Sequence, residues 1–182
     1  MDAVGDTRVD AVVDAESPID QHQHGRLRRL APGAGLVVLV LAVVCAVLAL
    51  EPVRIGSNSM APTLTAGERV LVDKVSLHFR EPRRGEIVAF YAPDNRDLTI
   101  KRVAAVAGDR IAIANGVLSV DGRRIHEDYV DHNLVKGEYF GPETVPIGTV
   151  FVLGDNRDDS IDSRSYGPVP TDDVVGRVLR IG

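Results

Sequence analysis

The most regular pattern in the sequence is IAIANGVLSV, residues 111–120. Two short apolar runs flank Asn115-Gly116, a dipeptide that two-residue hairpin turns of type I′ prefer because both of its residues adopt positive φ readily. Asp121-Gly122 follows at once and marks a second tight turn. Short strands joined by such turns are typical of antiparallel sheets. The stretch therefore predicts a small β subdomain, which we place at residues 111–149.

The same pattern of short strands and turn residues continues on both sides of this subdomain. No amphipathic helix of useful length interrupts it after residue 53. We therefore expect a mainly β domain at residues 51–182, built as an antiparallel sheet or partly open barrel that carries the small β subdomain as an insertion. Its other strands are expected at residues 69–72, 86–90, 99–107, 150–153 and 174–181.

An uncharged run of 17 residues, from Ala34 to Leu50, lies ahead of this domain. As a helix it would extend roughly 26 Å, and residues 30–33 would bring it to the ~30 Å of a hydrocarbon core. Arginines at positions 26, 28 and 29 precede the run. We therefore expect one transmembrane helix at residues 30–50, with a cytoplasmic N-terminus and an extracytoplasmic β domain.

Two other interpretations of the apolar run compete with an anchor. A cleavable signal peptide would use Val47-Leu48-Ala49 as its cleavage site, but the preceding region, about thirty residues and mostly acidic, does not fit one. A buried helix of a soluble domain would show an amphipathic stripe, which is lacking here. Residues 1–29 are rich in Asp and Glu and poor in large apolar residues, so we expect a disordered cytoplasmic tail.

Composition argues against several classes of partner and cofactor. A net charge of −5 and the absence of Trp give no support for nucleic acid binding. Cys45 is the single cysteine, so an intrachain disulfide and a multi-cysteine metal site are excluded. The acidic residues 155–162 do not fit a calcium loop, because Arg157 occupies a ligand position. Neither pattern therefore indicates a metal site.

Lys101 is the first candidate for chemistry, because it lies inside the strand expected at residues 99–107. In an extended strand its side chain shares a face with Val103 and Ala105. Apolar neighbours desolvate an amine, which disfavours its charged form and lowers its pKa. A neutral lysine can act as a general base. The competing interpretation is an ordinary surface lysine on an edge strand.

Ser57-Asn58-Ser59 is a second polar segment, and Pro62 opposes a helix through it. A loop or strand end is expected, where reactive groups are commonly presented. In an extended chain the two serine hydroxyls point the same way, so one would attack a carbonyl while the other stabilises the oxyanion. A Ser/Asn-rich turn without chemistry is the alternative.

The third polar segment is GDNRDDSIDSR, residues 154–164. It is too polar for a core element and suits a scaffold that orients other groups; its two arginines, Arg157 and Arg164, are expected to balance its carboxylates. A Ser-His-Asp triad finds no histidine in such surroundings. A cysteine peptidase would need an exposed thiol, whereas Cys45 lies in the apolar run.

Together these segments resemble type I signal peptidases, the membrane-bound Ser-Lys proteases that remove signal peptides from secreted preproteins. The resemblance runs from residue 51 to about residue 170 and includes the apolar run ahead of it. Lys101 stands where relatives of the endoplasmic reticulum carry His, which favours the bacterial or organellar branch. Gly56 and Asn58 depart from the residues common in the family. The matching segments are residues 57–64, 84–90, 101–109 and 154–167.

The resemblance implies a role for each matching polar residue. Ser59, directly before Met60, would be the nucleophile, and Lys101 the general base. The Ser57 hydroxyl and the Ser59 backbone N–H would form the oxyanion hole. Ser160 would orient Lys101. No metal or cofactor is implied.

The resemblance also implies supporting residues, substrates and a location. Asp162 and Arg164 would form a structural ion pair. Substrates would be preprotein signal peptides with small residues at −3 and −1, cut after an Ala-x-Ala-type site. The location would be the bacterial cell membrane, in contact with lipid and crossed once. The substrate pockets would be lined by Ile55, Met60, Leu64 and Ile100.

Two alternatives to a signal peptidase stay open at this point. A Ser-Lys protease with another substrate, such as a self-cleaving regulator, would share the same polar groups. A membrane-anchored β domain that only binds a partner, including an inactive paralogue, would share the fold.

Overall fold

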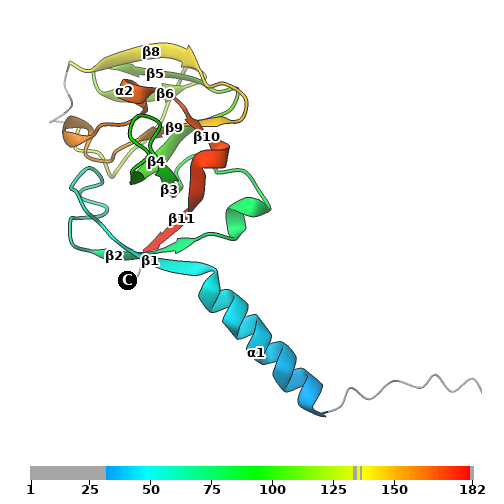
Figure 1. Cartoon of the computed structure of the whole chain (residues 1–182). Coiled ribbons are helices and arrows are strands. Elements are labelled where there is room, and N and C mark those ends of the chain that lie inside the picture. The colour runs from blue at the N-terminus through cyan, green and yellow to red at the C-terminus, as the bar shows by residue number, and fades with distance from the viewer. Residues whose placement is uncertain (1–31, 133–134, 136, 181–182) are drawn as a thin grey trace, which may run out of the picture.

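The computed structural model describes residues 32–132, 135 and 137–180. One helix, α1 (Pro32–Leu48), projects from a body made of two antiparallel sheets (Figure 1). The other helical segments are short: α2 (Ser163–Tyr166) and the 3₁₀ turns at residues 76–78, 157–159 and 171–173. The prediction of a mainly β, antiparallel fold is therefore confirmed.

The larger sheet has seven strands in the order β1-β2-β11-β3-β4-β9-β10. Each strand pairs with its neighbours antiparallel, and the edge strands β1 and β10 are not paired with each other, so the sheet stays open. Strands close to those expected are all present. Their bounds are β1 Leu50–Arg54, β2 Arg69–Asp73, β3 Ile87–Tyr91, β4 Leu98–Val106, β9 Thr149–Leu153, β10 Val169–Pro170 and β11 Val174–Arg180.

The smaller sheet has four strands in the order β7-β6-β5-β8: β5 (Arg110–Ala114), β6 (Val117–Val120), β7 (Arg123–Arg124) and β8 (Tyr139–Thr144). The predicted hairpin is confirmed, because β5 and β6 pair around Asn115 and Gly116, whose φ angles are 51° and 77°. The second predicted turn joins β6 to β7, with φ of 53° at Asp121 and 73° at Gly122. Both turns use residue types that tolerate positive φ.

One core cluster joins the two sheets. Ile111 and Leu118 of the small sheet are almost wholly buried in the same cluster as Phe151 and Leu153 of β9. Phe140 packs beside Phe151 with ring centroids 5.0 Å apart. Because these side chains come from both sheets, burial of their apolar surface holds the insertion against the main sheet.

A β-bulge in β4 changes which side chains share a face. Val103 pairs with Val152, but Ala105 pairs with Phe151, so the register shifts between them. Val103 lies in the core cluster of Val88 and Val152, whereas Ala105 lies in the cluster that joins the sheets. The extra residue of a bulge reverses the alternation of faces. The prediction that Ala105 shares a face with Lys101 and Val103 is therefore wrong.

The helix α1 falls within the predicted transmembrane segment at residues 30–50. Residues 30 and 31 lie outside the described part of the chain, and Leu50 belongs to β1. Within the described residues, no helix combines the length and apolarity that a membrane span requires. The predicted tail, residues 1–29, lies outside the described residues.

Candidate active site

The serine-bearing loop connects β1 to β2 and is closed at its base by backbone hydrogen bonds. The Ile55 N–H donates to the Glu68 carbonyl over 2.9 Å, and the Gly67 N–H donates to the Ile55 carbonyl over 2.8 Å. Met60 and Leu64 fix the loop from inside, since both side chains are almost completely buried in the core cluster beneath it. Ser57 and Asn58 remain exposed on the outer side of the loop, whereas Ser59 is buried.

Ser59 and Lys101 meet although 42 residues separate them in sequence. Lys101 Nζ and Ser59 Oγ are hydrogen-bonded at 2.7 Å, and the Ser57 and Ser59 hydroxyl oxygens lie 3.2 Å apart. Lys101 is 4% exposed and Ser59 is 8% exposed. Lys101 reaches Ser59 from β4, opposite Val88 of β3.

Burial lowers the pKa of the Lys101 amine below its ordinary value of 10.5, because desolvation disfavours the ammonium form. The nearby Asp162 carboxylate opposes this change in pKa, and the Arg164 guanidinium adds to it. Asp159 also raises the pKa, but desolvation is the largest of these effects, so the pKa is lowered. A neutral lysine amine next to a serine hydroxyl is the arrangement required of a general base and its nucleophile.

Asp162 is the centre of the third polar segment. Its carboxylate accepts hydrogen bonds from the Gly154 N–H (2.9 Å) and the Ser160 hydroxyl (2.8 Å). Arg164 donates to both carboxylate oxygens, from Nε and Nη2, each over 2.8 Å. The Asp162 side chain is fully buried and that of Arg164 is 13% exposed. Arg164 also pairs with Glu138, next to β8, so the segment is tied to the smaller sheet.

The Gly154 region contacts the backbone at Ser59 directly. The Asn156 N–H donates to the Ser59 carbonyl over 3.1 Å, and Asn156 Nδ2 donates to the Asn58 carbonyl over 3.2 Å. A Cβ atom at position 154 would lie 2.6 Å from the Ser59 carbonyl oxygen and 2.5 Å from Ser160 Cβ. The close approach of the two segments therefore requires glycine at position 154.

Two clefts meet at the Ser59–Lys101 pair. One, of about 460 Å³, is lined by Ser57, Ser59, Lys101 and Ser160 among others. The other, of about 260 Å³, shares the first three and continues along Ile55, Met60 and Ile100. Leu64 lies in the core below and does not line this cleft. No group of three or more metal-ligating side chains occurs among the described residues.

Comparison with known proteins identifies the family. Residues 28–181 match the family described as signal peptidase, peptidase S26. The chain belongs to this family. Signal peptidases of this family remove signal peptides, and membership makes the chain a peptidase.

Individual signal peptidases align over most of the chain. A probable signal peptidase I-1 of Synechocystis sp. (strain ATCC 27184 / PCC 6803 / Kazusa) is 39% identical over 153 residues, which are 79% of this chain and 76% of the relative. Signal peptidase IB of Staphylococcus aureus (strain COL) is 35% identical over 158 residues, 78% of this chain and 82% of the relative. The crystal structure of a signal peptidase I from Enterococcus faecalis V583 is similar with a TM-score of 0.50 and 32% identity, over 55% of this chain and 98% of that one.

This signal peptidase also has a second buried charge network that the sequence did not reveal. Arg102 forms a two-pronged pair with Asp155, with N–O distances of 2.8 and 2.6 Å. Arg157 pairs with Glu127 at 2.5 Å. The prediction that Arg157 balances a carboxylate of its own segment, residues 154–164, is therefore wrong. The Arg157 partner comes from a stretch 30 residues away, and no spacing in the sequence indicates it.

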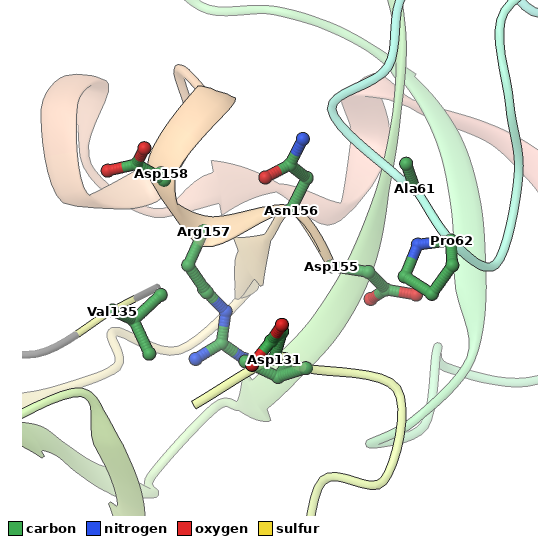
Figure 2. A pocket seen from close by; sticks show the side chains of 9 residues that line it. Ala61, Pro62, Asp131, Val135, Asp155, Asn156, Arg157 and Asp158 are labelled. Carbon is green, nitrogen blue, oxygen red and sulfur yellow. The ribbon is translucent and has the colours of Figure 1, made fainter. Parts of the chain in front are cut away.

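A further pocket, of about 300 Å³, lies on the side of residues 155–158 that faces Ala61 and Pro62 (Figure 2). Figure 2 shows the Arg157 side chain extending from the ribbon toward Asp131, with Val135 beside it. Nothing in the sequence pattern predicts this pocket, because its walls come from three separate parts of the chain.

Proposed function

We propose that this signal peptidase is a membrane-bound serine endopeptidase that cuts secreted preproteins after an Ala-x-Ala-type site, with Ser59 as nucleophile and Lys101 as general base. The observation that carries the proposal is the 2.7 Å hydrogen bond between the buried Lys101 amine and the Ser59 hydroxyl. A serine hydroxyl is a weak nucleophile on its own and needs an adjacent base.

In the first step Lys101 accepts the Ser59 Oγ proton while Oγ bonds to the carbonyl carbon of the substrate. The carbon–nitrogen bond then breaks, and the Lys101 ammonium returns its proton to the departing amine. In the second step Lys101 takes a proton from water, the hydroxide attacks the acyl-enzyme, and the Ser59 oxygen leaves with that proton. The lowered pKa of Lys101 supports this role, because a base must be unprotonated before each step.

The oxyanion formed in both steps would be held by the Ser57 hydroxyl and the Ser59 backbone N–H. The 3.2 Å separation of the Ser57 and Ser59 oxygens supports this assignment for the side chain. Ser160 would orient the Lys101 amine. Its hydroxyl donates to Asp162, and its oxygen retains the capacity to accept a hydrogen bond from that amine.

Small residues at −1 and −3 would occupy the cleft lined by Ile55, Met60 and Ile100. The cleft is continuous with the proposed dyad, and its volume of about 260 Å³ suits short side chains on an extended peptide. Leu64 supports this cleft from the core instead of touching the substrate.

The α1 helix would anchor the chain in the bacterial cell membrane, with the N-terminus cytoplasmic and the β domain outside. Residues 36–41 are six consecutive apolar residues, and each is at least half exposed. Six consecutive residues cover every face of a helix, so α1 presents apolar surface all round. Such a surface is stable when it is surrounded by lipid.

Cleavage by the detergent-solubilised chain tests the proposed chemistry. We expect a preprotein with an Ala-x-Ala site to be cut after the second Ala, and Ser59→Ala and Lys101→Ala each to abolish the cut. Lys74→Ala is the matched control, because Lys74 is a surface lysine in an exposed pair with Glu51. Cleavage that survives in folded Lys101→Ala would overturn the dyad.

Extraction of membranes with alkaline carbonate tests the anchor. The full chain should stay in the membrane pellet, and Val40→Arg should release it, because a charge in the middle of the helix opposes insertion. Release of the unmodified chain would contradict the anchor and leave the dyad untouched.

A further inference from the structure

We propose that Glu127 is a positioning residue that sets the geometry of both Ser59 and Lys101. The proposal rests on the proposed Ser-Lys function. Glu127 follows β7 in the inserted part of the chain, and its side chain is 1% exposed. One of its carboxylate oxygens, Oε1, accepts hydrogen bonds from two partners, Arg157 and Tyr129. Each partner leads to one member of the dyad.

The first path runs from Glu127 to the nucleophile. Arg157 Nη2 donates to Glu127 Oε1 over 2.5 Å, and Arg157 Nε donates to the Gly154 carbonyl over 3.0 Å. Gly154 in turn lies against the Ser59 carbonyl, and the Gly154 N–H donates a hydrogen bond to the Asp162 carboxylate. The position of the Gly154 peptide, and through it the Ser59 backbone, therefore depends on where Glu127 holds Arg157.

The second path runs from Glu127 to the strand of the base. The Tyr129 hydroxyl donates to Glu127 Oε1 over 3.0 Å, and the Arg102 guanidinium carbon lies 4.0 Å from the Tyr129 ring centre. Burial and the Glu127 charge raise the Tyr129 pKa, so its hydroxyl stays protonated and remains a donor. Arg102 directly follows Lys101 in β4 and is clamped to Asp155.

The buried pair of Glu127 and Arg157 is incompletely satisfied. Among the described residues, Arg157 Nη1 and Glu127 Oε2 have no hydrogen-bond partner. A buried ion pair of this kind contributes little net stability, because desolvation of both charges offsets their attraction. The Arg157 side chain also borders the pocket of about 300 Å³ in Figure 2. Without Glu127, it has room to turn away and release the Gly154 carbonyl.

The test compares full-length Glu127→Gln, Glu127→Asp and Glu143→Gln in peptide cleavage. Glu127→Gln keeps the shape but loses the charge, and we expect kcat to fall at least tenfold while KM changes less than twofold. Glu127→Asp keeps the charge and should recover part of kcat. Glu143→Gln changes an exposed glutamate of β8 in the same insertion and should leave both parameters unchanged.

Amide hydrogen exchange tests the positioning without a substrate. Glu127→Gln should accelerate exchange at the Asn156 N–H, which binds the Ser59 carbonyl, more than at amides in the centre of β9. If the wild type cuts no substrate but this exchange changes, the proposed function fails and the positioning stands. If exchange is unchanged, the positioning proposal fails, whatever the activity.

Tyr129→Phe is the second variant, for the case in which Glu127→Gln does not fold. It removes only the hydroxyl and keeps the ring under Arg102, and we expect a severalfold lower kcat with an altered acid limb of the pH profile. A folded Tyr129→Phe or Glu127→Gln protein with wild-type kcat would overturn the proposal. The proposal would also fail if each variant's loss of kcat were fully explained by the fraction of its molecules that is unfolded.

Discussion

Lys101 Nζ lies 2.7 Å from Ser59 Oγ at a position where the lysine side chain is only 4% exposed. Desolvation lowers the pKa of this amine, so less of it is protonated at neutral pH than of a surface lysine. We expect kcat/KM for peptide cleavage to rise with pH through an apparent pKa below 10.5. A pH–rate profile checks this, and an acid limb at or above 10.5 would contradict it.

The same shift in pKa links Lys101 to stability. Between its lowered folded pKa and its unfolded value, the unfolded chain binds more protons than the folded chain. The Lys101 contribution to the free energy of unfolding should therefore rise with pH across that window and be lost as pH falls through it. Urea unfolding of wild type and Lys101→Met at several pH values measures the difference. A difference that does not depend on pH would show that the amine is not desolvated in solution.

Gly154→Ala should damage both stability and activity. The added Cβ would lie 2.6 Å from the Ser59 carbonyl oxygen, so the loop that carries Ser59 or the 154–160 segment must move. We expect a loss of about 1–3 kcal/mol in the free energy of unfolding, as for other overpacked sites, and a large fall in kcat. Gly35→Ala, at a glycine of α1 that has no positive φ and no described atom within 4 Å of an added Cβ, controls for loss of glycine alone. Wild-type kcat in Gly154→Ala would argue against this close packing.

Asp162→Ala should be strongly destabilising, because it leaves the Arg164 guanidinium without its main partner and removes the acceptor of the Gly154 N–H. Breaking one side of a buried pair costs about 3–5 kcal/mol. Arg96→Ala breaks an exposed pair with Asp173 and should cost at most about 1 kcal/mol. Chemical denaturation of both variants gives the comparison, and equal effects would contradict the buried role of Asp162.

Substitutions at Leu64 and Ile100 should have different effects, the first on the free energy of unfolding and the second on substrate specificity. Leu64 is fully buried in the core, so Leu64→Ala should cost about 2–5 kcal/mol without changing the preferred residue at −1. Ile100 lines the cleft beside Ser59 and Lys101, so Ile100→Ala should admit larger residues there. A library of peptides varied at −1 measures both. An unchanged preference in Ile100→Ala would place the −1 residue elsewhere.

Sequence patterns predicted the elements whose geometry is local. The turn at Asn115-Gly116 requires two residues with positive φ, and few dipeptides provide them, so β5 and β6 could be predicted with their register. The β8 strand could not, because Gly141-Pro142 interrupts its pattern. The face of Ala105 was predicted wrongly, since a bulge leaves no clear signal in a run of Val and Ala.

The site shows the same division between local and long-range information. Ser59 and Lys101 were predicted as nucleophile and base, and the structure brings them into hydrogen-bond contact. Leu64 was expected in the pocket, but whether an apolar residue faces a cleft or the core depends on long-range packing. Glu127 gave no signal, because a single glutamate between turn residues is usually solvated. Its burial accompanies its ion pair with Arg157, which lies 30 residues away in the 154–164 segment.

The turn at Asp121-Gly122 has a practical consequence for labelling this enzyme. Among the described residues, no atom lies within 4 Å of a Cβ added at Gly122, and Arg123 beyond it is exposed, whereas the turn at Gly116 is packed against Val135. A fluorophore or a short affinity tag inserted after Gly122 would therefore project into solvent from the turn that follows the C-terminal end of β6. Such a reporter would allow the enzyme to be followed in living cells while it is working.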